Sequence, residues 1–326
     1  MQKIKVGIIG YGNLGRGVEK AVTYASDMQL VGVFSRRNPE SVKTVTGAKV
    51  YSTEDIKDFK GKVDVMILCG GSATDLPEQT VKYIKDFNTV DSFDTHAKIP
   101  EYFEKVDKAG KEYGHLGAIS IGWDPGLFSI MRMLFGTVLP NGNDYTFWGK
   151  GVSQGHSDAI RRIKGVKDAK QYTVPIENAV TAVRNGENPT FTTREKHLRD
   201  CYVVLEDGAD KNYVEKTIKE MPNYFADYDT TVHFISQEEL NKNHAGLPHG
   251  GFVLRSGKTD ESINHLLEFS IKLDSNPEFT GSVLTAYARA VYKMANKGVT
   301  GAVTVFDVPI KELSPLDESA LRANLL

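Results

Sequence analysis

The sequence has little cysteine, no long apolar run and almost no net charge. Its two cysteines, Cys69 and Cys201, stand far apart without Cys-x-x-Cys or metal-ligand spacing, which excludes a disulfide framework and predicts reduced thiols in a core or near a site. No apolar run approaches the roughly 20 residues of a membrane span, and the opening MQKIKVGIIG has no cleavage-site pattern, so we expect a cytoplasmic protein. A formal net charge of -2 gives no reason to expect nucleic acid or a membrane as a partner, which leaves small molecules as the expected ligands.

What the chain does have is an alternation of apolar and amphipathic segments in its first third. Its 326 residues are enough for two domains, and they contain no internal repeat or obvious linker. Such alternation is typical of β-α-β units, so we predict an α/β fold with a doubly wound, Rossmann-like parallel sheet. The expected strands are 4–9, 30–35, 63–69, 89–94 and 116–122. The expected helices are 14–25, 75–87 and 99–114.

The pattern changes after GWDPG at 122–126. Strand-like runs now dominate, which predicts a second, α+β domain with a mixed or antiparallel sheet. These runs are 144–149, 201–206, 230–236, 251–257 and 266–273. An amphipathic helix at 282–298 and a strand-like run at 302–308 follow. We expect the domains to be 1–122 and 123–276, with 277–326 packing back on the first.

Gly10, Gly12 and Gly15 form a G-x-G-x-x-G loop between a predicted strand and a predicted helix. In a dinucleotide-binding loop such glycines allow, in order, a tight turn, a close approach of the backbone to pyrophosphate, and tight helix–strand packing. The N-terminus of the helix then faces the anion. Because strand, loop and helix follow one another in the required order, we predict a dinucleotide site here.

The second predicted strand ends in Ser35, Arg36 and Arg37, where an NAD-binding protein usually has an acidic residue. An acid would repel a 2′-phosphate, whereas two guanidinium groups and a hydroxyl can bind one through charge-assisted hydrogen bonds. This favours NADP(H) over NAD(H). The alternative is that the two arginines only form a solvated strand end.

Loops after later strands complete the expected cofactor site, because an open α/β sheet binds its ligands at the carboxyl edge. The first is Cys69-Gly70-Gly71-Ser72, which lacks the lysine of a phosphate-binding P-loop and could also be a plain strand–helix turn. We list Cys69, Gly70, Gly71 and Ser72 as expected cofactor contacts. The other residues expected to contact the cofactor are Tyr11, Asn13, Leu14, Ser92, Phe93, Asp94, Ile121, Gly122, Trp123, Asp124 and Pro125.

Several longer blocks are more specific than the glycine loop. They are GYGNLG, FSRR, LCGGSATDLPEQ, SFDTH, GWDPGLFS, TFWGKGVSQGHSDAIRRI, MPNYF and GLPHGG, and together they resemble the meso-diaminopimelate dehydrogenase family over most of the chain, to about Ala288. The resemblance implies NADP-dependent oxidative deamination of the D-centre of meso-2,6-diaminopimelate to L-2-amino-6-oxopimelate and ammonia, or the reverse, in the lysine and cell-wall precursor pathway. It also implies a dinucleotide-binding first domain and a second domain that binds substrate and forms a homodimer.

This substrate has an amino acid head at each end, so its site must hold two carboxylates and two ammonium groups. Asp94 and Asp124 both follow strand ends at the edge where the nicotinamide is expected. The resemblance assigns them to the reacting D-head, as catalytic and substrate-binding residues that orient the ammonium and accept its proton. From the local pattern alone, Asp124 before Pro125 is also typical of a turn, and Asp94 could be a cap.

The resemblance assigns the other substrate contacts to the second domain. Trp148 is expected along the apolar chain of the substrate, although a lone tryptophan on a strand is more often part of a core. The residues Gln154, Gly155 and Asp158 are expected to shape the pocket of the D-centre.

At the L-head, the resemblance implies that Arg199, Thr173 and His249 bind the carboxylate. An arginine suits this task because its fork can hold a carboxylate through two parallel hydrogen bonds. Asn276 is assigned to substrate or nearby cofactor. Without the resemblance, the charged stretch REKHLRD would make Arg199 a surface residue, and LPHGG would make His249 a loop residue.

Two other functions remain open from the residues alone. An NADP-dependent reductase of dihydrodipicolinate or of aspartate semialdehyde would need a His-Lys cluster or a nucleophilic cysteine, and neither stands in the expected context. A redox-sensing, NADPH-binding protein would keep the loop and the arginines but would not need the carboxylates together with Arg199. His244 and His249 bracket AGLP without an HExxH motif, so no metal site is expected.

Overall fold

The computed structural model describes residues 3–326, and the chain divides into two compact units. The first unit consists of Met1–Ile130 and Pro277–Leu326, and the second consists of Met131–Asn276. The C-terminal segment therefore belongs to the same unit as the N-terminal segment. The boundary that the sequence suggests at 122 lies inside the first unit.

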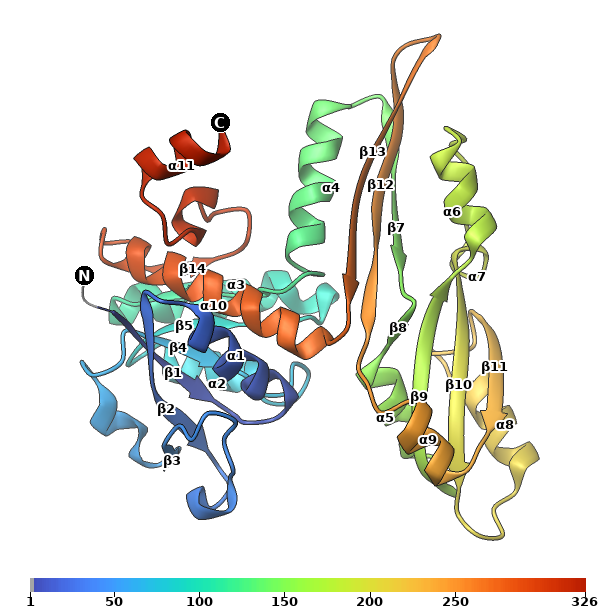
Figure 1. Cartoon of the computed structure of the whole chain (residues 1–326), viewed down its shortest axis with the longest axis horizontal. Coiled ribbons are helices and arrows are strands. Elements are labelled where there is room, and N and C mark those ends of the chain that lie inside the picture. Colours follow the sequence, from blue (N-terminus) through green and yellow to red (C-terminus); the bar gives the residue numbers. More distant parts are fainter. Residues whose placement is uncertain (1–2) are drawn as a thin grey trace. The chain divides into compact units, whose positions relative to one another are not determined.

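The first unit contains a seven-stranded sheet in which all neighbouring strands are parallel (Figure 1). The strand order β14-β6-β5-β4-β1-β2-β3 runs outwards from β1 in both directions, which confirms the predicted doubly wound sheet. The strands are β1 (Ile4–Ile9), β2 (Met28–Ser35), β3 (Val50–Ser52), β4 (Val65–Leu68), β5 (Asn88–Asp91), β6 (Leu116–Ala118) and β14 (Gly301–Val303). The run expected at 302–308 is a strand only as far as Val303.

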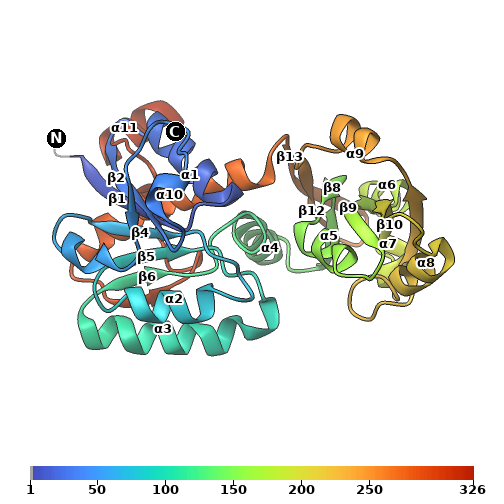
Figure 2. The same ribbon diagram turned by 90° about the horizontal axis from the view of Figure 1, so that it is seen from below.

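Helices cover both faces of this sheet, as Figure 2 shows, with α2 and α3 on one side and α1 and α10 on the other. Side chains alternate accordingly along β4, because Ile67 joins the core of α1 and α10 whereas Met66 joins the core of α2 and α3. The α-helices are α1 (Asn13–Tyr24), α2 (Leu76–Tyr83), α3 (Ile99–Tyr113), α10 (Asn276–Ala295) and α11 (Glu318–Leu325). The 3-10 helices are η1 (Pro39–Ser41), η2 (Asp55–Phe59), η3 (His96–Lys98) and η4 (Ile310–Leu313).

Close packing and an ion pair attach α10 to the N-terminal part of the unit. A Cβ added at Gly17 in α1 would lie 2.5 Å from the carbonyl oxygen of Pro277, so only glycine permits this approach of the two helices. Further along α10, Arg289 binds Asp27 through two hydrogen bonds, of 2.6 Å from Nε and 2.7 Å from Nη2. These bonds hold the pKa of Asp27 below its usual range, which indicates that the pair stabilises the folded unit.

The second unit contains two smaller sheets, with strand orders β11-β10-β9-β8 and β13-β12-β7. Only β10 and β11 pair in parallel, so the unit has the mixed, α+β character that the sequence predicts. The strands are β7 (Gly142–Trp148), β8 (Gly151–Val152), β9 (Val166–Pro175), β10 (His197–Leu205), β11 (Asp229–Phe234), β12 (His249–Asp260) and β13 (Ile263–Leu273). Helix α4 (Leu127–Val138) begins in the first unit and continues into the second. The other helices of the second unit are α5 (Gln154–Arg161), α6 (Glu177–Arg184), α7 (Thr193–Lys196), α8 (Lys211–Lys219) and α9 (Gln237–Asn243).

The sequence did not predict β8, β9 or the helices of the second unit. The stretch VKDAKQYTVP has few apolar residues, and its inward-facing positions include the polar Gln171 and Thr173, so hydrophobic alternation does not reveal the strand. Within residues 3–326, no helix combines the length and the apolar character needed to cross a membrane.

Candidate functional site

The G-x-G-x-x-G loop joins the end of β1 to the start of α1. Gly10 has a φ of +87°, which side-chain-bearing residues rarely adopt, and a Cβ there would lie 3.1 Å from the carbonyl oxygen of Cys69. A Cβ at Gly15 would collide with the carbonyl oxygen of Gly10. A Cβ at Gly12 would meet nothing within 4 Å. Gly10 thus forms the tight turn, Gly12 leaves the backbone open to approach, and Gly15 allows close packing, as a dinucleotide loop requires.

The N-terminus of α1 is suited to an anion. Gly12 at the cap position has no side chain, and no acidic residue occupies the first turn of the helix. The nearby carboxylate of Glu19 is fully buried and is engaged elsewhere, by the hydroxyl of Tyr11 and by the backbone N–H of Val45 at 3.0 Å. The positive end of the helix dipole is therefore not neutralised from within this loop.

The predicted 2′-phosphate residues lie next to the glycine loop. Ser35 is buried at the end of β2, and its Oγ accepts the backbone N–H of Arg37 at 3.1 Å. The guanidinium of Arg37 donates to the carbonyl oxygen of Tyr11 at 2.6 Å, so it is attached to the loop itself. Two exposed arginines at this position give the edge of the loop a local positive charge.

Arg36 links the glycine loop region to the loop after β4. Its Nη1 lies 3.0 Å from Oδ1 of Asp75, whose other oxygen accepts the backbone N–H of Gly71 at 2.9 Å. Because 71% of the Arg36 side chain is exposed, this ion pair is weak and an incoming phosphate can compete for the guanidinium. Cys69, at the start of the same loop, is buried, and burial raises the pKa of its thiol well above the usual range.

The buried carboxylate of Asp91 organises the next two strand ends, a role that the sequence did not reveal. Its Oδ1 accepts the backbone N–H groups of Phe93 at 2.9 Å and Ser120 at 3.1 Å. Its Oδ2 accepts the hydroxyls of Tyr102 at 2.6 Å and Thr80 at 3.0 Å. Complete burial raises the pKa of this carboxyl group. The sequence shows only an acid at the end of a strand that also contains the polar Asn88 and Thr89.

Asp94 and Asp124 follow neighbouring strands, β5 and β6, at the carboxyl edge of the sheet. Asp94 is exposed, and its backbone N–H donates to Oγ of Ser72 at 2.9 Å, which ties the loop after β5 to the loop after β4. Asp124 is half-buried, as is Pro125 after it, whereas Trp123 before it is buried. The other expected contacts at these strand ends are Ser92, Phe93, Ile121 and Gly122, of which all but the half-buried Ser92 are buried.

In the second unit, residues far apart in the sequence line up across neighbouring strands. Arg199 on β10 pairs in register with Thr173 on β9, and Thr173 pairs with Gly151 on β8. A Cβ at Gly151 would lie 2.5 Å from Nδ1 of His249, so the missing side chain makes room for the imidazole. The backbone N–H of Val152 donates to the carbonyl oxygen of Pro248 at 2.8 Å. The structure therefore brings together the three residues expected at the L-head.

Arg199 is buried, although its sequence neighbourhood alone suggested a surface charge. It is 6% exposed, donates to the hydroxyl of Thr173, and lies 3.7 Å above the ring centroid of Tyr228. Among residues 3–326, Arg199 is not one of the arginines that form an ion pair with an acid. Its Nε has no hydrogen-bond partner. Burial lowers its pKa. A desolvated guanidinium without an acidic partner is costly, and this one is therefore a candidate binding group for an anion.

Trp148 is held by His197, a second residue that sequence reasoning missed. The two rings stack with centroids 5.3 Å apart, and the backbone N–H of Trp148 donates to Nε2 of His197 at 2.8 Å. His197 is 1% exposed, and burial lowers its pKa to about 3. Because Nε2 accepts a hydrogen bond, the neutral ring has its proton on Nδ1.

The remaining expected substrate residues lie on α5 and at the start of α10. Gln154 and Gly155 are exposed in the first turn of α5, and Asp158 forms an ion pair with Arg161 on the same helix. The backbone N–H of Asn276 donates to the carbonyl oxygen of Leu247 at 2.9 Å. Asn276 is thereby attached to the segment that carries Pro248 and His249.

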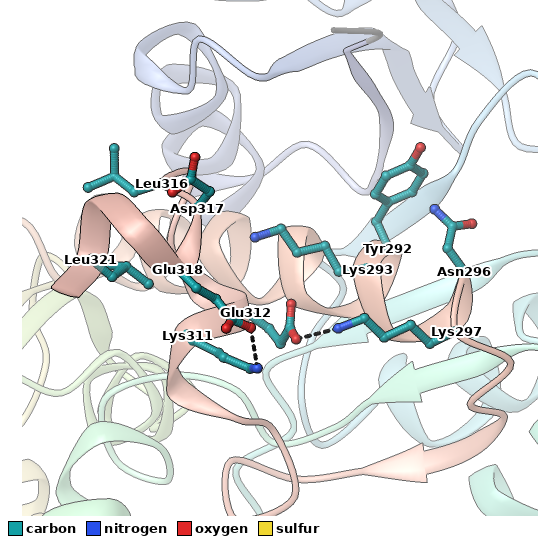
Figure 3. A pocket seen from close by; sticks show the side chains of 10 residues that line it. All are labelled: Tyr292, Lys293, Asn296, Lys297, Lys311, Glu312, Leu316, Asp317, Glu318 and Leu321. Carbon is teal, nitrogen blue, oxygen red and sulfur yellow. Dashed lines mark hydrogen bonds and ion pairs between the residues drawn. The ribbon is translucent and has the colours of Figure 1, made fainter. Parts of the chain in front are cut away.

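A pocket of about 410 Å³ in the first unit has a different character. Figure 3 shows its lining residues, which come from α10, η4, α11 and the turn between η4 and α11. The charges that line it neutralise one another, because Lys297 pairs with Glu312 at 2.5 Å and Lys311 pairs with Glu318 at 2.5 Å. It contains none of the residues at the carboxyl edge, so we do not assign the cofactor or the substrate to it.

Comparison with known proteins identifies relatives over the whole chain. Residues 122–275 match the family described as "Diaminopimelic acid dehydrogenase C-terminal domain". The meso-diaminopimelate D-dehydrogenase of Ureibacillus thermosphaericus is 61% identical over 326 residues, and the match covers 100% of both chains.

Solved structures that are similar to this chain include two that contain a ligand. A Q154L/T173I/R199M/P248S/H249N/N276S mutant of meso-DAPDH from Clostridium tetani, crystallised with DAP, is 54% identical with a TM-score of 0.95 and covers 99% of this chain and 100% of its own. An engineered D-amino acid dehydrogenase bound to NADP⁺ is 42% identical with a TM-score of 0.89, and 100% of both chains is covered. The residues that this chain has at the six mutated numbers are Gln154, Thr173, Arg199, Pro248, His249 and Asn276.

Proposed function

The chain belongs to the meso-diaminopimelate D-dehydrogenase family, and on this premise we propose that it catalyses the NADP-dependent oxidative deamination of the D-centre of meso-2,6-diaminopimelate. The products are L-2-amino-6-oxopimelate and ammonia, and the reverse reaction is a reductive amination. We place it in the lysine and cell-wall precursor pathway. The observation that carries the proposal is the buried, acid-free guanidinium of Arg199 in line with Thr173 and His249.

We assign the cofactor to the first unit. The open space beside Gly12 and the uncapped start of α1 suit a pyrophosphate, and Ser35, Arg36 and Arg37 suit a 2′-phosphate. When bound, the nicotinamide supplies the acceptor for a hydride. The loops from Gly10 to Gly15, from Cys69 to Ser72, from Ser92 to Asp94 and from Ile121 to Pro125 would form its protein surroundings.

We assign the L-head of the substrate to the second unit. Arg199 would bind the L-carboxylate through charge-assisted hydrogen bonds, with Thr173 and His249 beside it. Arg199 is already oriented by the hydroxyl of Thr173 and the ring of Tyr228, so little side-chain entropy is lost on binding. Trp148 would cover the apolar chain, and Gln154, Gly155, Asp158 and Asn276 would line the rest.

The carboxylates of Asp94 and Asp124 would serve the D-head. The ammonium group of the substrate must lose a proton before the D-carbon can release a hydride, and a carboxylate within hydrogen-bond reach can orient the group and accept that proton. The C–H and N–H bonds break as a C=N bond forms. Water then adds to the imine carbon, and ammonia leaves as the carbonyl oxygen forms.

Binding of the L-head explains why the D-carbon, and not the L-carbon, is oxidised. If Arg199 holds the L-head, only the D-carbon is offered for oxidation, whereas exchanging the heads would present an L-carbon with the wrong face. Simple D-amino acids would leave Arg199 and its neighbours unpaired, which disfavours them.

A turnover assay tests the proposal. Purified protein with NADP⁺ and meso-diaminopimelate should increase absorbance at the NADPH band and release one equivalent of ammonia per NADPH. A protein that binds NADPH but shows no turnover would instead support the sensor alternative and exclude this function.

We further propose that the second unit forms a homodimer. The strand β13 is an edge of its sheet, and the exposed apolar side chains of the unit include Ile263 and Leu266 on β13 and Met133 and Val138 on α4. Leu266→Asp should convert a dimer into a monomer in analytical ultracentrifugation, with Tyr24→Asp, at a 90% exposed residue of the first unit, as the control. A monomeric wild type would contradict this assignment.

The cytoplasm is the proposed location of the enzyme. Both cysteines are free and buried, which agrees with a reducing compartment.

A further inference from the structure

Gln171 lies next to the L-head residues, although nothing in the sequence pointed to it. It stands two residues before Thr173 on β9, and its register partner on β10 is Cys201. In an antiparallel pair, directly opposite residues and residues two apart on one strand point to the same face. Gln171, Thr173, Arg199 and Cys201 therefore share one face of the sheet.

On this face Gln171 lies between an apolar core on one side and the polar pair Thr173 and Arg199 on the other. Beyond it lie Ala169 and Val203, which pack in a core that includes Phe225. On its other side lie Thr173 and Arg199. Same-face residues two apart on a strand are separated by about 6.6 Å, a gap that a glutamine side chain and a bound carboxylate can span together.

The side chain of Gln171 has no hydrogen-bond partner in the free protein. The residue is 0% exposed, and neither Nε2 nor Oε1 finds a partner. Its backbone is fully used, because its N–H donates to Oγ of Ser157 at 2.9 Å and its carbonyl oxygen accepts the N–H of Ser153 at 3.0 Å. An apolar residue of the same size would avoid the cost of a buried, unsatisfied carboxamide.

The partner that the carboxamide lacks is one that an amino acid head can supply. Nε2 can donate to a carboxylate and Oε1 can accept from an ammonium group. The orphan Nε of Arg199 on the same face is a further unused donor. A low-dielectric setting strengthens such bonds once they form.

We propose that Gln171 is a further specificity-determining residue, whose carboxamide binds the distal amino acid head of the substrate beside Arg199. The inference rests on the proposed function. Gln171 would thus lower stability in the free protein and contribute affinity only when a two-headed substrate is bound.

The test replaces Gln171 with the unbranched, apolar Met and measures KM and thermal stability together. In Gln171→Met the KM for meso-diaminopimelate should rise about tenfold or more, as expected for loss of a hydrogen bond to a charged group, while the KM for NADP⁺ stays unchanged. The thermal midpoint should stay equal or rise, because two buried, unsatisfied atoms are removed. An unchanged KM for the substrate, or a KM that rises only together with a fall in the midpoint, would overturn the inference.

A matched control comes from the first unit. Thr89 on β5 is also 0% exposed, with an Oγ1 that lacks a partner. Thr89→Val should leave both KM values unchanged and the midpoint equal or higher. If Gln171→Met does not fold, Gln171→Asn retains a shortened carboxamide, and its KM for meso-diaminopimelate should rise more than its KM for a D-amino acid without a distal head. Equal changes on both substrates would count against the role.

The activity of the wild type shows whether a negative result refutes the proposed function or only the role of Gln171. No NADP⁺ reduction by wild type would refute the proposed function, and the role of Gln171 with it. Turnover by wild type with an equal KM in Gln171→Met would refute the role of Gln171 alone.

Discussion

The two units of this protein build their proposed binding groups in different ways. In the first unit, the glycine loop and its arginines lie within the segment 10–37 and offer mainly backbone groups and an exposed charge. In the second, Arg199, Thr173 and His249 come from three strands and meet through strand register and a gap at Gly151. A site made from local backbone can be recognised from sequence, whereas a site made by register cannot.

The proposed binding groups of the two units also differ in whether they have hydrogen-bond partners in the free protein. Arg36 and Arg37 have partners in the free protein, Asp75 and the carbonyl oxygen of Tyr11. The buried Arg199 and Gln171 have atoms without partners. The second unit thus carries destabilising polar groups that a ligand can satisfy, which is typical of a specificity site.

The largest expected effect concerns Arg199. Arg199→Met should raise the KM for meso-diaminopimelate about 1000-fold, since a buried charge-assisted contact to a carboxylate is lost, and leave the KM for NADP⁺ unchanged. Its stability should stay equal or rise, because an unpaired buried charge is removed. Steady-state kinetics and thermal melts check both points.

A matched control is Arg255, which is equally buried but pairs with Asp144 at 2.9 Å. Arg255→Met should lose about 3 kcal/mol of stability and keep both KM values. Loss of affinity in both variants would mean that Arg199 is only structural.

The next effect concerns cofactor choice in the first unit. In wild type, NADPH should bind more tightly than NADH, and Arg36→Ala with Arg37→Ala should raise the dissociation constant of NADPH about 100-fold while that of NADH changes little. Fluorescence titration with both nucleotides measures this. Equal constants in wild type would leave the arginines as a solvated strand end.

Acid should weaken the second unit first. Burial lowers the pKa of His197 to about 3 and of His156 to about 4, so the unfolded chain takes up protons at a higher pH than the folded one. Stability is therefore complete above about pH 6.5 and falls as pH decreases towards the folded values, by about 2 kcal/mol per histidine at pH 5.

Hydrogen exchange resolved by peptide, at pH 7 and pH 5, reports each unit separately. His197→Phe should reduce the loss of protection in the second unit, whereas His96→Asn, at an exposed position of the first unit, should not. Equal loss of protection in both variants and both units would contradict burial of neutral His197 as the cause.

The smallest expected effect concerns the glycine loop, where we expect Gly12 to affect cofactor binding and Gly15 to affect stability. Gly12→Ala should leave stability unchanged, because the added Cβ meets nothing within 4 Å, yet raise the KM for NADP⁺ about tenfold by blocking the approach of the pyrophosphate. Gly15→Ala should lower stability, since its Cβ collides with the carbonyl oxygen of Gly10. A destabilised Gly12→Ala would remove the distinction between the two glycines.

Much of the first unit was predictable because its information is local. The strand at 4–9 was predicted with its observed ends, since a short apolar run followed by a glycine turn marks it directly. Asp91 escaped prediction because a single acid in a strand does not reveal four hydrogen bonds to partners from Thr80 to Ser120.

The second unit was predictable only in part. Arg199, Thr173 and His249 were named through resemblance, and the charged neighbours of Arg199 pointed the other way. The sequence did not indicate a role for Gln171, because its carboxamide is buried without a hydrogen-bond partner only once the strands pair in register. Single-sequence patterns report which side chains are apolar, whereas this site depends on which polar side chains the fold buries.

We propose that Arg199 of the second unit binds the L-head of a two-headed substrate and that only the D-carbon of this substrate is oxidised. The most direct test records NADPH absorbance with NADP⁺ and, separately, the meso, L,L and D,D isomers of diaminopimelate. We expect a rapid rise in absorbance with the meso isomer and little change with the L,L isomer, which has no D-carbon to oxidise. Equal rates with the meso and L,L isomers, or no reaction with any isomer, would contradict it.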